Sequence, residues 1–95
     1  MSELTLSDRI AVPEAVVSRD VGGETVILNL ETGIYFGLDP VGSDIWKSLQ
    51  VSDALQDAFE AIRAEYDVDA DVLRRDLLHL VSEMAAKGLV KAAGS

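Results

Sequence analysis

The first half of the chain alternates apolar and polar residues with the period of two that is typical of β-strands. The clearest run is residues 24–30, "ETVILNL", of which at least one face should be buried. Turn signals stand on both sides, at residues 22–23 and 31–33, where glycines accept the positive φ that tight turns need. Residues 15–20, before the first turn, and residues 34–38, after the second, are the two further strand-like segments. The pattern therefore predicts a three-stranded antiparallel meander.

Beyond Pro40 the apolar period changes to about 3.6 residues, which indicates helices. We expect a short helix from near residues 41–43, a second from residue 52 or 53, and a third and longest one up to Lys87. Asp69 is the expected N-cap of the third helix, and Gly88 should end it in a left-handed conformation. Residues 89–90 would then close back on the core.

The length of 95 residues is enough to bury one modest core, so we expect a single domain. This domain should span residues 10–92 and follow a flexible N-terminal arm, residues 1–9, whose composition is polar and mixed. The predicted fold class is α+β, with a three-stranded antiparallel sheet followed by three helices.

Composition narrows the classes of partner. The formal net charge of −9 opposes binding to phosphate backbones and anionic lipid surfaces, so neither nucleic acid nor a membrane is expected. An acidic surface favours basic or neutral peptides, although surplus acids also serve solubility. The absence of cysteine excludes disulfides and thiolate metal sites. With no apolar run of about 20 residues and no secretory signal, a cytoplasmic location is expected.

The third predicted helix carries more apolar surface than a small core requires. Its core stripe consists of Leu73, Leu77, Leu80 and Met84. A second row at the same helical spacing consists of Arg74, Leu78, Val81 and Ala85. The row either widens the buried face or forms one wall of an apolar groove.

The other wall of such a groove would be the strand at residues 34–38. Tyr35 and Phe36 point to opposite faces, so one can be core while the other lines an exposed shelf. Gly33 and Gly37 leave the backbone accessible, and an edge strand offers unpaired N–H and C=O groups to an extended peptide. The same edge could pair with a second copy, giving a homodimer. The alternative is two aromatic residues packed on the two faces of a hairpin.

Catalytic and metal-binding chemistry finds little support. His79 is the only histidine, and no cysteine or G-x-S-x-G element exists to partner it. Asp67, Asp69 and Asp71 alternate like the start of a calcium loop, but the required glycine and glutamate are missing further on. The two glycines at residues 22–23 are not part of the G-x-G-x-x-G pattern of a phosphate-binding loop. We therefore expect no enzyme activity, no metal and no cofactor.

Taken together, two stretches resemble one family of small proteins. Residues 24–46, "ETVILNLETGIYFGLDPVGSDIW", and residues 64–90, "AEYDVDADVLRRDLLHLVSEMAAKGLV", are similar to the PqqD family, named for protein D of pyrroloquinoline quinone biosynthesis. The resemblance covers residues 14–90. Its main carriers are Thr32, Gly33, Tyr35, Leu38, Pro40, Gly42, Ile45, Trp46, Tyr66, Val68, Asp76, Lys87, Gly88 and Leu89.

The resemblance implies a winged-helix-like RiPP recognition element, a non-catalytic module that binds the leader segment of a ribosomally made precursor peptide. In that family the leader adds as a strand to the third strand of the sheet and packs against the third helix. The implied peptide-binding residues are Gly33, Ile34, Tyr35, Phe36, Gly37, Leu38, Arg74, Arg75, Leu78, Val81, Ser82 and Ala85.

The resemblance also implies a modifying enzyme as partner. This would be a radical SAM enzyme in the quinone-cofactor branch of the family, or a leader protease and cyclase in the lasso-peptide branch. The motifs do not separate these branches, although "YFGLDPVGSDIW" is somewhat closer to the cofactor branch.

Two other function classes stay open. A winged helix can bind DNA, but residues 69–84 set Arg74 and Arg75 against four acidic residues, which disfavours that function. A non-catalytic structural subunit of a biosynthetic enzyme complex could use the same exposed edge for permanent docking.

Overall fold

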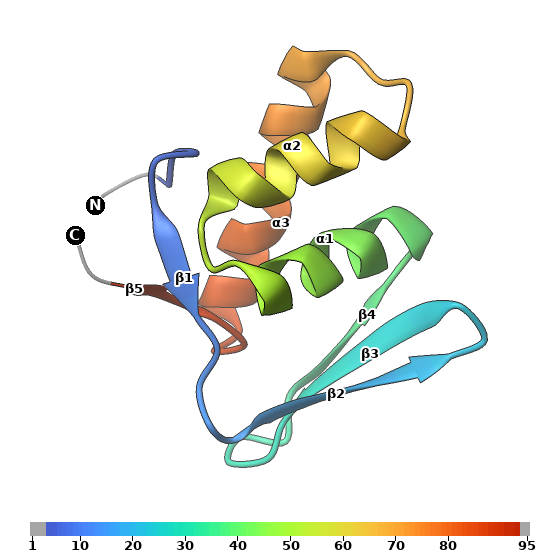
Figure 1. The fold of residues 1–95 in the computed structure, drawn as a ribbon. Helices are drawn as coiled ribbons and strands as arrows, with labels where there is room; N and C mark the ends of the chain where they lie inside the picture. Colours follow the sequence, from blue (N-terminus) through green and yellow to red (C-terminus); the bar gives the residue numbers. More distant parts are fainter. Residues whose placement is uncertain (1–3, 94–95) are drawn as a thin grey trace.

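The computed structural model describes residues 4–93. Its strands are β1 (Arg9–Ala11), β2 (Val16–Val21), β3 (Glu24–Asn29), β4 (Tyr35–Leu38) and β5 (Lys91–Ala93). Its helices are α1 (Pro40–Val51), α2 (Leu55–Glu65) and α3 (Ala70–Ala86). The expected α+β class is confirmed, with a sheet in the order β2-β3-β4 followed by the three helices (Figure 1).

The three-stranded sheet is an antiparallel meander, and α1 covers one of its faces (Figure 1). Gly22, Gly23 and Gly33 have φ of 62°, 90° and 77°, as the tight turns require. The buried face of β3 is the more polar one, because Thr25 and Asn29 lie on it beside Ile27. Hydrogen bonds make that burial acceptable, among them one from the Thr25 backbone N–H to Ser43 Oγ at 2.9 Å.

The first two helices begin at residues other than those expected. The helix α1 begins at Pro40, because the Asp39 side chain caps it by accepting a hydrogen bond from the Gly42 N–H at 2.7 Å. The helix α2 begins at Leu55 rather than at residue 52 or 53. Ser52 instead ends α1, and Asp53 forms an ion pair with Arg9, so neither residue caps α2.

The helix α3 has the predicted ends. Asp69 caps it through hydrogen bonds from the N–H groups of Asp71 and Val72. Gly88 follows with a φ of 75°, and Leu89 and Val90 are buried, so the predicted return to the core is confirmed. The core lies between the inner face of the sheet and the three helices. Within residues 4–93, no helix has the length and apolar character needed to span a bilayer.

A second sheet, absent from the predicted elements, joins the two ends of the chain. The strand β1 pairs antiparallel with β5, in the register Arg9 to Ala93 (Figure 1). Of the expected flexible arm, residues 1–3 lie outside the described residues. Leu4 and Leu6 pack partly buried against the core, and Arg9 already belongs to β1.

Candidate peptide-binding groove

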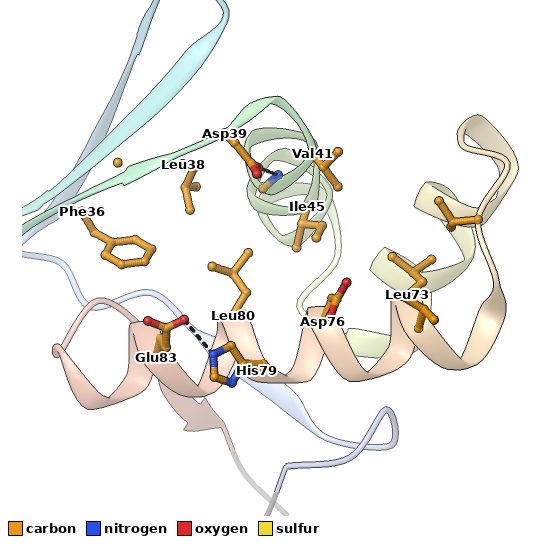
Figure 2. Close-up of a pocket in the computed structure, with 14 residues that line it drawn as sticks. Phe36, Leu38, Asp39, Val41, Ile45, Leu73, Asp76, His79, Leu80 and Glu83 are labelled. Carbon is orange, nitrogen blue, oxygen red and sulfur yellow. Dashed lines mark hydrogen bonds and ion pairs between the residues drawn. The ribbon is translucent and has the colours of Figure 1, made fainter.

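A groove of about 600 Å³ runs between β4 and α3 and extends to the first turn of α1 (Figure 2). Its lining residues are Phe36, Gly37, Leu38, Asp39, Val41, Gly42, Ile45, Val68, Val72, Leu73, Asp76, His79, Leu80 and Glu83. Most of the lining is apolar, which suits a ligand that carries apolar side chains.

On the wall formed by β4, the two neighbouring aromatic residues have different surroundings. Phe36 stands opposite Ile27 on the inner face and is partly buried against the core. Its ring points toward Leu80 across the groove (Figure 2), and the Lys87 ammonium lies 5.8 Å from the ring centroid. Tyr35 stands opposite Leu28 on the outer face and is 73% exposed. The predicted division between an inner and an exposed aromatic side chain is confirmed.

The outer edge of β4 is unpaired in the part of the chain that the structure describes, because β4 is the last strand of its sheet. The Asn29 N–H donates to the Ile34 carbonyl at 2.9 Å, which sets the alternation of the antiparallel ladder. Phe36 and Leu38 therefore bond to β3, whereas Tyr35 and Gly37 direct their N–H and C=O groups to the open edge. These four groups can pair with an added strand.

The wall formed by α3 combines apolar and acidic side chains. Leu73 and Leu80 face the groove, and Asp76 points into it between them (Figure 2). His79 Nε2 lies 3.1 Å from Glu83 Oε1. With Asp39 just after β4, three carboxylates of the described residues line the groove, and no lysine or arginine among residues 4–93 does. The groove is therefore apolar along its floor and carries three carboxylates along its rim, with the Lys87 ammonium beside Phe36.

The predicted α3 residues do not share this groove with β4. Arg74, Arg75, Leu78, Val81, Ser82 and Ala85 line a separate hollow, together with residues of β1 and β5 and the segment before β1. The expectation that the row Arg74, Leu78, Val81 and Ala85 faces the strand is therefore wrong.

The positions of these residues around the helix explain the error. At 100° per residue, the buried residues of α3 separate two flanks, and β4 lies beside the flank opposite to that row. Val81 is itself fully buried core, whereas Leu80, assigned to the core stripe, opens onto the groove. Of the predicted strand residues, Phe36, Gly37 and Leu38 line the groove.

Sequence reasoning missed the α3 residues that do line the groove. Val72, Asp76, His79 and Glu83 recur at i, i+4, i+7 and i+11, which is the spacing of the row that was selected. Three of these four side chains are polar or charged, and the row was missed because only a mainly apolar row was taken as a groove wall.

The side chain of Asn29 connects the turn before β4 to the end of α3. Its Nδ2 donates to the Gly88 carbonyl at 2.9 Å, and its Oδ1 accepts from the N–H groups of Glu31 at 2.9 Å and Thr32 at 3.2 Å. Asn29 is buried, so its side-chain amide depends on these bonds for its polar partners. They hold the two walls of the groove in register at one end.

Comparison with known proteins agrees with this geometry. The sequence profile described as coenzyme PQQ synthesis protein D (PqqD) matches residues 24–90. The chain belongs to the PqqD family. Among solved structures, this PqqD-family chain is similar to "TbiB1 in Complex with the TbiA(beta) Leader Peptide", with 40% identity and a TM-score of 0.81. That match covers 88% of this chain and 98% of the other.

A second solved structure shows the fold alone. It is "Lasso peptide synthetase B1 complexed with the leader peptide", with 20% identity and a TM-score of 0.77. The match covers 86% of this PqqD-family chain and 96% of the other. No curated protein matches the chain.

Proposed function

We propose that this chain is a RiPP recognition element, which binds the leader segment of a ribosomally made precursor peptide and presents the precursor to a modifying enzyme. The observation that carries the proposal is the open edge of β4 beside an apolar groove. The 40% identical TbiB1, whose structure contains a leader peptide, supports it.

In this function the leader adds as a strand beside β4. Its backbone pairs with the outward N–H and C=O groups of Tyr35 and Gly37, which gives affinity with little dependence on sequence. Because side chains alternate along a strand, every second leader residue enters the groove between Phe36 and Leu80. Apolar leader residues suit this floor, and basic ones suit the carboxylates at its rim.

The modifying enzyme supplies the chemistry. Among residues 4–93, no three His, Asp or Glu side chains come together in a way that could hold a metal ion. The proposal assigns binding to this chain and catalysis to a partner in the cytoplasm. Resemblance to the family implies two kinds of partner, a radical SAM enzyme or a leader protease and cyclase.

Two substitutions of one residue test strand addition. A Cβ at Gly37 would meet no atom within 4 Å and the φ of this residue is not positive, so Gly37→Ala should leave affinity unchanged. Gly37→Pro deletes the outward N–H without removing a bond to β3. An unsatisfied hydrogen-bonding partner costs roughly 1–3 kcal/mol, so the dissociation constant should rise about five- to a hundredfold.

The ligand for this test is the leader of the precursor encoded beside this chain, titrated by calorimetry, with circular dichroism of each variant as the check on folding. Equal affinity of the folded alanine and proline variants would refute strand addition at β4. Absence of binding by the unsubstituted chain would refute the proposed function itself.

A further inference from the structure

The flank of α3 that faces away from β4 forms a second hollow, of about 740 Å³. Its accessible floor is apolar, with Leu78 and Ala85 from α3 and Leu4 from the segment before β1. Beneath them lie the buried core residues Val81, Ile10 and Val90. The leader groove does not include this surface, apart from the shared residue His79 at the boundary. The proposed leader binding therefore leaves the hollow unused.

The charge of this hollow is opposite to that of the whole chain. Among residues 4–93, Arg74, Arg75 and Lys91 line it and no acidic residue does, although the whole chain carries 17 acidic and 8 basic residues. Arg74 lies 3.3 Å from Asp71, whose side chain is 85% exposed, so solvent weakens that pair. Arg75 and Lys91 form no ion pair with any residue among 4–93.

Distant acids do not cancel this local charge. At physiological salt, charges separated by more than about 8 Å are largely screened from one another. A ligand in the hollow therefore experiences mainly the charges of Arg75 and Lys91, together with that of Arg74, which Asp71 partly neutralises. Because the floor is apolar, a ligand that carries only charge would leave most of the surface uncovered.

We propose that the hollow is a docking site for an acidic peptide segment of a partner protein, with an apolar side chain on the floor and flanking carboxylates on Arg74, Arg75 and Lys91. The two flanks of α3 then differ in sign, since the leader groove is rimmed by carboxylates. Opposite charges direct the basic and the acidic peptide to different sides of one helix. The chain can therefore bind the leader and the acidic peptide at the same time.

The probe for the test is a synthetic fluorescent peptide in which leucine alternates with glutamate, added to the full chain and followed by anisotropy. A matched peptide with glutamine in place of glutamate reports the part played by charge. We expect saturable binding of the glutamate peptide that weakens as salt rises, and binding at least tenfold weaker for the glutamine peptide. Equal binding of the two, or no saturable binding, would overturn the proposal.

Charge-reversal variants locate the site. The double variant Arg74→Glu with Arg75→Glu should weaken binding of the glutamate peptide at least tenfold. The control double variant, Arg19→Glu with Arg63→Glu, makes the same change in net charge away from the hollow and should have less than a threefold effect. Equal loss in the two double variants would show a response to net charge only and would refute the site.

Two further experiments distinguish this site from the leader groove: amide chemical shifts, and competition between the glutamate peptide and the leader. The glutamate peptide should shift the amide signals of Ser82 and Lys91 and leave that of Gly37 unchanged. A saturating amount of the precursor's leader should leave the affinity of the chain for the glutamate peptide unchanged. Displacement by the leader, or shifts centred on Gly37, would show that one surface serves both peptides.

Discussion

Asn29 shows how a single buried amide can set the geometry of a binding surface. Its side chain bonds to three backbone groups, at Glu31, Thr32 and Gly88, and so fixes the approach to β4 against the end of α3. A hydrophobic residue could fill the same space but could not satisfy these groups. Hydrogen bonding therefore determines which side chain suits position 29 more than side-chain volume does.

Replacing this amide should destabilise the fold. Asn29→Ala removes three hydrogen bonds made by a buried side chain, and a hydrogen bond contributes roughly 0.5–1.5 kcal/mol. We expect the free energy of unfolding in urea to fall by about 2 kcal/mol. The control is Gln56→Ala, which removes an exposed amide bonded only to Glu60 and should change the free energy by less than about 0.5 kcal/mol. Equal changes in the two variants would contradict this account.

Tyr66 provides a second test at the level of one side chain. Its hydroxyl donates to Asp44 Oδ2 at 2.5 Å, and this bond raises the pKa of Tyr66 above the ordinary value of 10.0, with further contributions from desolvation and nearby carboxylates. Because the folded pKa exceeds the unfolded one, the stabilisation is complete below about pH 10. It should be lost as the pH rises through the folded pKa.

The measurement is an ultraviolet absorbance titration in a Tyr35→Phe background, where Tyr66 is the only tyrosine. Adding Asp44→Asn should bring the pKa of Tyr66 back toward 10.0. An identical titration curve with and without the Asp44 carboxylate would show that this hydrogen bond does not govern the ionisation.

Among the elements, α3 contributes to two separate surfaces, and two of its leucines distinguish them. Leu80 faces the leader groove and Leu78 the basic hollow. Burial of a leucine against a peptide contributes roughly 1–3 kcal/mol, so Leu80→Ala should raise the dissociation constant of the leader about five- to a hundredfold. Leu78→Ala should change it less than about threefold. Calorimetry on the two folded variants compares their dissociation constants for the leader. A larger effect of Leu78→Ala than of Leu80→Ala would support the row predicted from sequence as the leader-binding surface.

The elements themselves were largely predictable from sequence, because local signals govern them. The glycine turns, the Asp69 cap and the Gly88 stop each act within a few residues. The short strands β1 and β5 were not predictable, since three residues carry no periodicity. Their pairing is a tertiary event between opposite ends of the chain.

The candidate site was predictable only on its strand side. The open edge of β4 follows from its place as the last strand of the meander. Which flank of α3 faces that edge depends on how the helices pack, and two rows with the same spacing are equivalent in sequence. The exchange of roles between Leu80 and Val81, neighbours in the chain, shows how small a rotation decides the outcome.

For the whole molecule, an exposed strand edge and a high net charge act against each other. The open edge of β4 favours pairing between copies, whereas the charge of −9 opposes their approach. We expect the average mass from light scattering to rise with protein concentration and with salt, which screens the repulsion. Saturating leader should return the mass to that of a monomer, because it occupies the same edge. A dimer insensitive to leader would be held by another surface.

The pairing of β1 with β5 places both ends of the described chain beside the basic hollow, since Lys91 and Ala92 line it. A protein fused at either end would therefore start close to this surface. A short flexible tether gives a local concentration on the order of millimolar, far above that of most free partners in a cell. Fusion and charge attraction can therefore each bring a partner to the hollow. A separate partner depends on the cations of the hollow for binding, whereas a tethered partner does not.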